Sequence, residues 1–294
     1  MDVSIALGGG GSRGAAHIGV LRALQSSGIR VRAVSGTSIG SVVASFFAFG
    51  LTPDQIETAF SSVDQAKLYG WPLSDGPGLL GVRGIYDFLK SQIGDVTFEN
   101  LKLPCAAVAI DLKSNREIFL RRGSVLDAIM GSIAVPGLFP PKELDGYSLI
   151  DGGTLDPIPV RAARDLAPDL PVIAVTLMAP LEMPATSIGI VSLPSENSFV
   201  KQIARMNITQ AFRIFADSVD IASRQMAELR LSLDDPELII RPDVNGINLL
   251  DSINVHEIAR LGEIATERAL PDLFRSLSLS ARMTRQVRRM LRRI

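Results

Sequence analysis

Two glycine-rich turns decide the fold class of this chain, and their sequences are Gly8-Gly9-Gly10-Gly11-Ser12-Arg13-Gly14 and Gly36-Thr37-Ser38-Ile39-Gly40. Each turn follows a short apolar run, Val3–Leu7 or Val31–Val34, and leads into a segment with helical periodicity. The second helical segment is apolar on nearly all sides, which indicates a buried helix. This alternation of strand, turn and helix predicts a layered α/β fold.

The second turn contains the pattern G-x-S-x-G, which places Ser38 at a tight turn between a strand and a helix. Such a turn exposes the hydroxyl of a nucleophilic serine, and Gly36 and Gly40 allow the backbone to pack closely around it. A purely structural turn can carry the same residues. The first turn can offer several backbone N–H groups at a helix start, where negative charge is favoured. A nucleophile beside an anion site predicts acyl transfer.

The first turn also fits the dinucleotide-binding pattern, with Gly9, Gly11 and Gly14 at the required positions. That motif needs an acidic residue about 20 positions later, where it binds the ribose. No Asp or Glu occurs between Asp2 and Asp54. Dinucleotide binding is therefore retained only as a minor alternative.

A serine nucleophile needs a base, and the chain has only 2 histidines. His17 follows the glycine-rich turn, and we expect it to brace that turn. His256 lies near the start of a late predicted helix, where an exposed or capping position is favoured. A histidine-based triad is retained as a weak alternative.

Asp151 is the better candidate for the base, because it ends a short predicted strand and is followed by Gly152 and Gly153. The paired glycines permit a sharp turn and a close approach to another backbone segment. An unperturbed Asp, with a pKa of about 3.9, is a weak base, so proton transfer would depend on fixed geometry. The alternative for Asp151 is a turn-forming aspartate. Asp111 and Asp156 compete with it but lack the paired glycines.

Three blocks of the chain resemble, in order, the signature blocks of patatin-like phospholipases: Gly9–Gly14, Gly36–Gly40 and Asp151–Gly153. Ser132–Pro141 and Asp243–Leu270 resemble the bacterial branch of that family, and the resemblance extends to about residue 273. It implies a three-layer α/β/α fold with a central, mostly parallel sheet and the serine nucleophile on a strand–turn–helix elbow.

The same resemblance implies the chemistry. Ser38 would be the nucleophile and Asp151 the base of a Ser–Asp dyad without histidine, which would hydrolyse lipid acyl esters through an acyl-enzyme. The oxyanion hole would consist of backbone N–H groups from Gly9, Gly10 and Gly11. The supporting residues would be Arg13, Gly36, Gly40, Gly152 and Gly153. No metal or other cofactor is expected. Bulky side chains at Gly10 or Gly11 are expected to lower the rate more than the stability.

The expected substrates are phospholipids, lysophospholipids or simpler acyl esters. The alternative from another class is a non-catalytic module of the same fold that binds lipid or a regulatory partner. Candidate walls of an acyl groove are Phe46, Phe47, Leu138 and Phe139, and candidate lids are the loops Tyr69–Gly84 and Ala179–Ser198. Ordinary core and surface positions are the alternatives for these residues.

Composition predicts a cytoplasmic globular protein. The 294 residues are 47% hydrophobic and 21% charged, and the one cysteine, Cys105, excludes an intramolecular disulfide and lies in an apolar run typical of a buried thiol. We see no targeting signal at the start of the sequence, and no apolar run reaches the ~18 residues that a spanning helix needs.

The end of the sequence differs in charge from the rest. Seven arginines and no acidic residue lie between Arg275 and Ile294, although the net charge of the chain is −1. We predict one catalytic domain, residues 1–273, followed by a basic amphipathic helix or tail at 274–294. Arg282–Arg293 could contact an anionic membrane surface. A homodimer contact is an open alternative, and no nucleic-acid partner is expected. The preceding helix is predicted at Val255–Leu270, stopped by Pro271.

Overall fold

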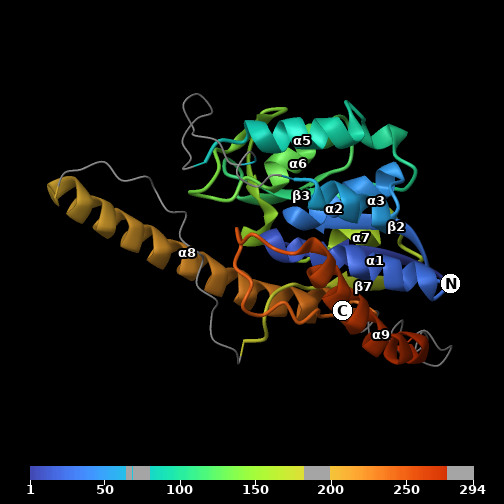
Figure 1. Cartoon of the computed structure of the whole chain (residues 1–294). Coiled ribbons are helices and arrows are strands. Elements are labelled where there is room, and N and C mark those ends of the chain that lie inside the picture. The colour runs from blue at the N-terminus through green and yellow to red at the C-terminus, as the bar shows by residue number, and fades with distance from the viewer. Residues whose placement is uncertain (64–67, 69–79, 182–198, 277–294) are drawn as a thin grey trace, which may run out of the picture.

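The computed structural model describes residues 1–63, 68, 80–181 and 199–276 (Figure 1). Its strands form an eight-stranded sheet in the order β5-β6-β3-β2-β1-β7-β8, and β4 pairs with β3 off this path. The parallel members are β1 (Asp2–Leu7), β2 (Arg30–Thr37), β3 (Cys105–Asp111), β7 (Val172–Val175) and β8 (Leu238–Ile240). Strands β4 (Arg116–Leu120) and β6 (Tyr147–Asp151) are antiparallel to β3, and β5 (Lys142–Leu144) is antiparallel to β6. The predicted mostly parallel sheet is confirmed.

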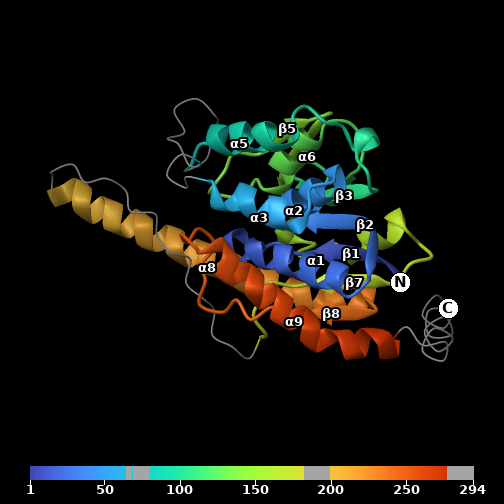
Figure 2. The same ribbon diagram turned by 45° about the vertical axis from the view of Figure 1, so that its right-hand side comes forward.

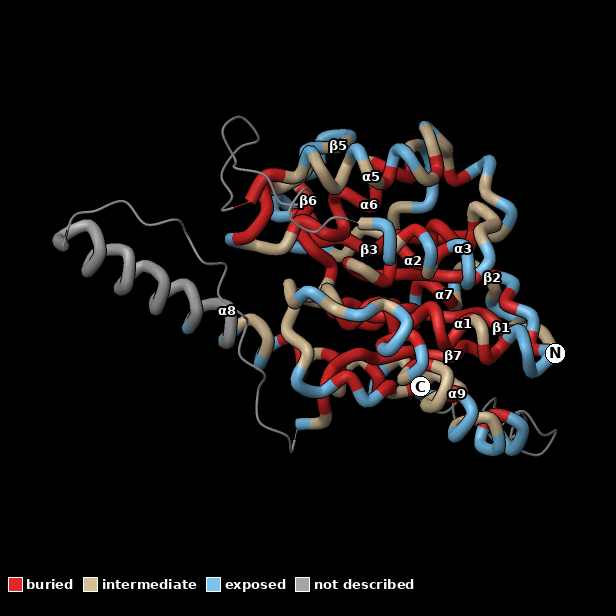
Figure 3. Tube along the Cα trace, in the orientation of Figure 1, coloured by how far each residue is buried: buried red, intermediate tan, exposed pale blue. Residues whose placement is uncertain are grey.

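Helices cover both faces of this sheet, which gives the predicted three-layer α/β/α architecture (Figures 1 and 2). In β1, Val3, Ile5 and Leu7 belong to one apolar core and Ala6 to another, because successive side chains of a strand point to opposite faces. The larger core lies under α1 (Ala16–Ser26), α2 (Ile39–Phe49), α3 (Pro53–Ser61), α5 (Arg83–Ile93) and α6 (Val125–Ser132). The smaller core is covered by α7 (Val160–Leu166) and the end of α8 (Phe199–Asp234). Figure 3 shows that the central strands are mostly buried, whereas many residues of the outer helices are exposed.

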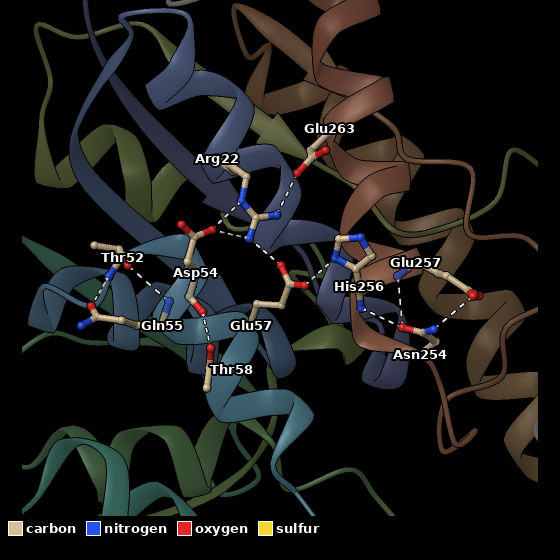
Figure 4. A network of polar contacts seen from close by, with 10 residues as sticks. All are labelled: Arg22, Thr52, Asp54, Gln55, Glu57, Thr58, Asn254, His256, Glu257 and Glu263. Atoms are coloured by element: carbon tan, nitrogen blue, oxygen red, sulfur yellow. Dashed lines mark hydrogen bonds and ion pairs between the residues drawn. The ribbon is translucent and has the colours of Figure 1, made fainter.

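Helices α1 and α9 (Val255–Ser276) cross at very short range (Figure 2). A Cβ added at Gly19 would overlap the carbonyl oxygen of Ala259, and one added at Gly262 would overlap that of Ala16. An ion-pair cluster at the surface joins the same helices to α3, and Figure 4 shows Arg22 at its centre. The Arg22 guanidinium pairs with Glu57 at 2.5 Å and with Glu263 at 2.8 Å. The late helix is therefore a tightly attached part of the domain.

The residues Thr52-Pro53-Asp54-Gln55 predict an N-terminal capping box with proline at the first helical position. This prediction is confirmed in α3, because Thr52 and Gln55 exchange side-chain and backbone hydrogen bonds. The predicted stop at Pro271 is wrong, because α9 continues through this proline to Ser276. Leu273 beyond it is fully buried in the larger core, so tertiary packing offsets the proline's cost. Helices α5 and α7 were not predicted.

Helix α8 is the longest described element at 36 residues, and its first half extends away from the sheet (Figures 1 and 2). Its second half contacts the body, where Ala227 and Leu231 join the smaller core. None of the helices in the described part of the chain is both long enough and apolar enough to cross a membrane.

Candidate active site

Ser38 occupies the predicted elbow between β2 and α2. Its backbone has φ 55° and ψ −128°, an unusual conformation for a residue other than glycine, and such strain is found mainly where surrounding contacts enforce it. Gly40 follows directly beneath β1, so close that a Cβ there would overlap the carbonyl oxygen of Leu7. The glycines of the pattern thus serve close packing, as expected.

Ser132, at the end of α6, holds the elbow from the side. The Ser38 N–H donates to the Ser132 hydroxyl oxygen at 3.0 Å, and that hydroxyl donates to the Val108 carbonyl at 2.6 Å. Ser132 is fully buried, so no water competes for these bonds. In the sequence, Ser132 begins the segment Ser132–Pro141 that resembles bacterial patatin-like phospholipases. Its contact with the elbow is seen only in the structure.

Asp151 ends β6, and the pairing of β6 with β3 brings it beside Ser38. In the antiparallel register Asp151 lies opposite Ala109, one residue beyond the Val108 that pairs with Thr37. Ser38 and Asp151 line the same cavity, and the Ser38 side chain lies close enough to the carboxyl to lower its pKa. The Gly153 N–H donates to Asp151 Oδ1 at 2.7 Å. Burial raises the pKa of Asp151 to about 6, against the opposing effect of the Ser38 side chain and the Gly153 N–H.

Hydroxyl groups of β2 also hold the segment that follows Asp151. Thr37 Oγ1 donates to the carbonyl of Asp156 at 2.8 Å, and Ser35 Oγ donates to that of Pro159 at 2.7 Å. The strand that ends at Ser38 and the segment after Asp151 are therefore linked directly, without an intervening helix.

The glycine-rich turn lies opposite Ser38 and differs in one respect from the prediction. The Gly9 N–H donates to the Pro157 carbonyl at 2.9 Å, so it cannot also serve an oxyanion in this conformation. Within the described residues, no group accepts a hydrogen bond from the N–H of Gly10 or Gly11. The candidate donors are thus reduced from three to these two.

The expectation that bulk at Gly11 would spare the fold is also corrected. Gly11 has φ +55°, and a Cβ there would overlap the Leu249 carbonyl oxygen. At Gly10 an added Cβ would approach the Leu177 side chain to 3.0 Å, a contact that a side chain can relieve. Of these two positions, Gly10 is the one where a side chain can be added without a clash against backbone atoms.

Arg13 and His17 brace the glycine-rich turn, as expected. Arg13 Nε donates to the Gly10 carbonyl at 3.0 Å, and His17 Nε2 lies 2.7 Å from the Gly8 carbonyl. Burial lowers the pKa of His17 to about 4, so the neutral ring donates through Nε2–H. His256 contacts Glu57 at the surface (Figure 4), far along the chain from the elbow. No contact joins either histidine to Ser38 in the described part of the structure.

The competing aspartates have other surroundings. Asp111 accepts backbone N–H bonds from Ser114 and Ser148, each at 2.9 Å, and hydrogen bonding holds its pKa at about 2. Asp156 is fully buried, and neither of its carboxyl oxygens has a hydrogen-bond partner among the described residues. Burial and the nearby charge of Asp234 raise the pKa of Asp156 to about 8. Neither lines a described cavity that contains Ser38.

Two cavities meet at Ser38, and both also include Val135 and Leu249 in their walls. The first, which we call the α8-side cavity, has a volume of about 80 Å³ and contains Gly10, Asp151 and residues of α8. The second, the α5-side cavity, has a volume of about 160 Å³ and extends between α2, α3 and α5.

Two of the four residues predicted as walls of an acyl groove line these cavities. Leu138 lines the α8-side cavity and Phe139 lines the α5-side cavity. Phe46 and Phe47 line neither and are core residues; Phe46 is fully buried against the rings of Phe60 and Phe88. Most of the predicted lid loops, residues 69–79 and 182–198, and the arginine-rich end lie outside the described residues. No group of three or more metal-ligating side chains occurs in the part of the chain described.

Residues 5–164 match the family model described as patatin-like phospholipase. An uncharacterized NTE family protein of Mycobacterium bovis is 39% identical over 176 residues, covering 60% of this chain and 49% of the relative. One from Mycobacterium tuberculosis is 26% identical over 292 residues, covering 93% of this chain and 48% of the relative. The chain thus spans about half the length of these relatives.

Among solved structures, VipD from Legionella pneumophila aligns with a TM-score of 0.49 and 15% identity, covering 92% of this chain and 66% of VipD. The family model covers more than half of the chain, including the elbow and the Asp151 turn. The chain belongs to the patatin-like phospholipase family.

Proposed function

We propose that this chain is a serine hydrolase that cleaves carboxylic ester bonds of lipids, with Ser38 as nucleophile and Asp151 as base. The observation that carries the proposal is the position of Ser38 beside the buried Asp151 carboxyl in the wall of one cavity. It brings together a strained nucleophile elbow and a carboxylate whose raised pKa makes it a better base than an exposed Asp. Membership of the patatin-like phospholipase family supports the same reaction class.

Acylation begins with a proton transfer. Ser38 Oγ attacks the ester carbonyl carbon while Asp151 accepts the hydroxyl proton, and the carbonyl oxygen becomes an oxyanion. The tetrahedral intermediate then collapses, the bond from carbon to the alcohol oxygen breaks, and Asp151 returns the proton to the leaving alkoxide. The products of this half-reaction are a free alcohol and an acyl ester on Ser38.

Deacylation repeats these steps with water. Asp151 accepts a proton from the attacking water, and the carbon–Oγ bond breaks when Ser38 recovers that proton. The carboxylic acid leaves and the dyad returns to its starting state.

The N–H groups of Gly10 and Gly11 are the proposed oxyanion donors. Both lie at cavity walls that include Ser38, and their turn is held by Arg13 and His17. One such donor typically contributes about 3–4 kcal/mol of transition-state stabilisation. Because the turn is braced before substrate binds, the donors need no reorganisation during the reaction.

A fluorophosphonate probe tests the proposal against a non-catalytic lipid-binding module. The wild-type protein should be labelled at Ser38, and Ser38→Ala should not be. Asp151→Asn should react at least ~100-fold more slowly, since removal of a positioned base typically costs 10²–10⁴-fold. Absence of labelling in folded wild-type protein would instead favour the binding module. Nucleotide binding that survives Ser38→Ala would favour the dinucleotide alternative.

A further inference from the structure

We infer that the two cavities divide the ester between them, with the acyl chain in the α5-side cavity and the leaving alcohol in the α8-side cavity. This inference rests on the proposed function. With this division, the substrate is an ester of an aliphatic acid with a polar alcohol. Helix α8 then determines which alcohol is accepted.

The position of Asp151 fixes which part of the ester occupies which cavity. The group that accepts the Ser38 proton must return it to the leaving alkoxide, so the alcohol oxygen has to face that group. Of the two described cavities that share Ser38, only the α8-side cavity contains Asp151. The alcohol therefore leaves through the α8-side cavity. The acyl chain, on the other side of the carbonyl carbon, then has the α5-side cavity available.

The α5-side cavity has the lining that a hydrocarbon chain requires. Its side chains are aliphatic or aromatic apart from Ser12 and Ser38, and no charged residue lines it in the part of the chain described. Ile85 and Phe88 contribute from α5, and Ile253 contributes from the loop before α9. Burial of an aliphatic chain against such walls is favourable roughly in proportion to the apolar area covered.

The α8-side cavity is mixed in character. Apolar walls such as Val219 and Ile247 alternate with polar side chains, of which Ser223 and Asn248 carry uncharged donors and acceptors. It also contains Arg13 and Asp220, whose side chains lie 3.9 Å apart at its wall. Such a lining can hydrogen-bond an alcohol that carries further hydroxyl or phosphate groups. A hydrocarbon chain in the same cavity would leave these polar side chains without hydrogen-bond partners.

Each cavity can be narrowed by a substitution in its own wall that leaves the other cavity unchanged. Ile253→Phe narrows the α5-side cavity, and Val219→Phe narrows the α8-side cavity. Both replace a partly buried aliphatic residue by the same aromatic one, and neither residue belongs to the proposed dyad or oxyanion hole. Ile85→Phe and Ile247→Phe form a second matched pair for the same two cavities, in case a variant of the first pair does not fold.

The experiment measures kcat/KM for two ester series with all four variants. One series varies the acyl chain from acetyl to palmitoyl with a constant p-nitrophenol leaving group. The other keeps an octanoyl group and varies the alcohol from methanol to glycerol and glycerophosphate. We expect Ile253→Phe to lower the ratio of long-chain to short-chain kcat/KM about tenfold or more while leaving the alcohol preference unchanged. Val219→Phe should shift the alcohol preference and leave the acyl preference unchanged.

Three outcomes would overturn the inference. The two variants could show exchanged effects, each could change both preferences equally, or folded variants of both pairs could retain wild-type preferences. Failure of the proposed function gives a different result, because wild-type protein would then neither hydrolyse any ester nor react with the fluorophosphonate at Ser38. Circular dichroism and melting curves identify variants that are unfolded.

Discussion

Replacement of Asp151 by asparagine should slow hydrolysis at least ~100-fold and, at neutral pH, increase the stability of the protein. The folded state holds the Asp151 carboxyl almost completely buried, and burial raises its pKa from 3.8 to about 6. A pKa change of one unit corresponds to about 1.4 kcal/mol, so ionisation of Asp151 costs the folded state about 3 kcal/mol relative to the unfolded chain. Asparagine keeps an oxygen that can accept the Gly153 N–H bond and carries no charge.

The pH dependence has a definite sign. A carboxyl whose pKa is higher in the folded state binds its proton more tightly there, so folding is favoured most below pH ~4. That contribution is lost as the pH rises from ~4 to ~6 and stays lost above it. The free energy of unfolding of Asp151→Asn should therefore exceed that of wild type by up to about 3 kcal/mol at pH 7 and by less than about 1 kcal/mol at pH 4.

Urea denaturation of wild type and variant at pH 4, 5, 6 and 7 measures this difference. Asp111→Asn is a control with the opposite sign, because hydrogen bonds hold the pKa of Asp111 at about 2 and its ionised form stabilises the fold. That variant should be less stable than wild type at pH 7. The reasoning fails if Asp151→Asn is less stable than wild type at pH 7, or if its advantage does not change with pH.

Four further predictions follow from described contacts. Because Asp151 must be ionised to accept a proton, kcat/KM should rise through pH ~6 and reach a plateau above it; a rate independent of pH between 5 and 8 would contradict this assignment. Ser132→Ala leaves the buried Ser38 N–H without its acceptor and should lower kcat about tenfold and stability by about 1–3 kcal/mol, measured by kinetics and urea denaturation. His17→Leu should lower kcat more than it raises KM, and His17→Gln, which retains an N–H donor, should restore part of the rate. Gly262→Ala should separate α9 from α1 and lower the unfolding free energy by about 1–3 kcal/mol without changing KM in the protein that remains folded.

Local sequence patterns predicted the parts of the structure that depend on neighbouring residues. The elbow at Ser38, the capping box at Thr52 and the turn after Asp151 each combine glycines or capping residues within a few positions. Apolar runs likewise predicted β1 almost to the residue and the centre of β2, and helical periodicity predicted the start of α9. The residues of the candidate site could be predicted only because three such blocks occur in the order that is typical of patatin-like phospholipases.

Contacts between distant segments were not predictable from these patterns. The bond from Ser38 to Ser132 joins positions 94 residues apart, and the bond that occupies the Gly9 N–H depends on where the Pro157 segment crosses the turn. The continuation of α9 past Pro271 depends on the burial of Leu273 in a core built by other elements. In each case a tertiary contact outweighs a local preference.

The direct hydroxyl links between β2 and the segment after Asp151 have an evolutionary consequence. Thr37 and Ser35 bind the strand before the nucleophile to the segment after the base, whereas other parts of the cavity walls come from α5, α8 and the loop before α9. Mutations in those walls leave the bonds that separate and orient Ser38 and Asp151 unchanged. Members of a lineage built on this plan can therefore acquire new substrates one wall at a time, while the reacting pair is inherited intact.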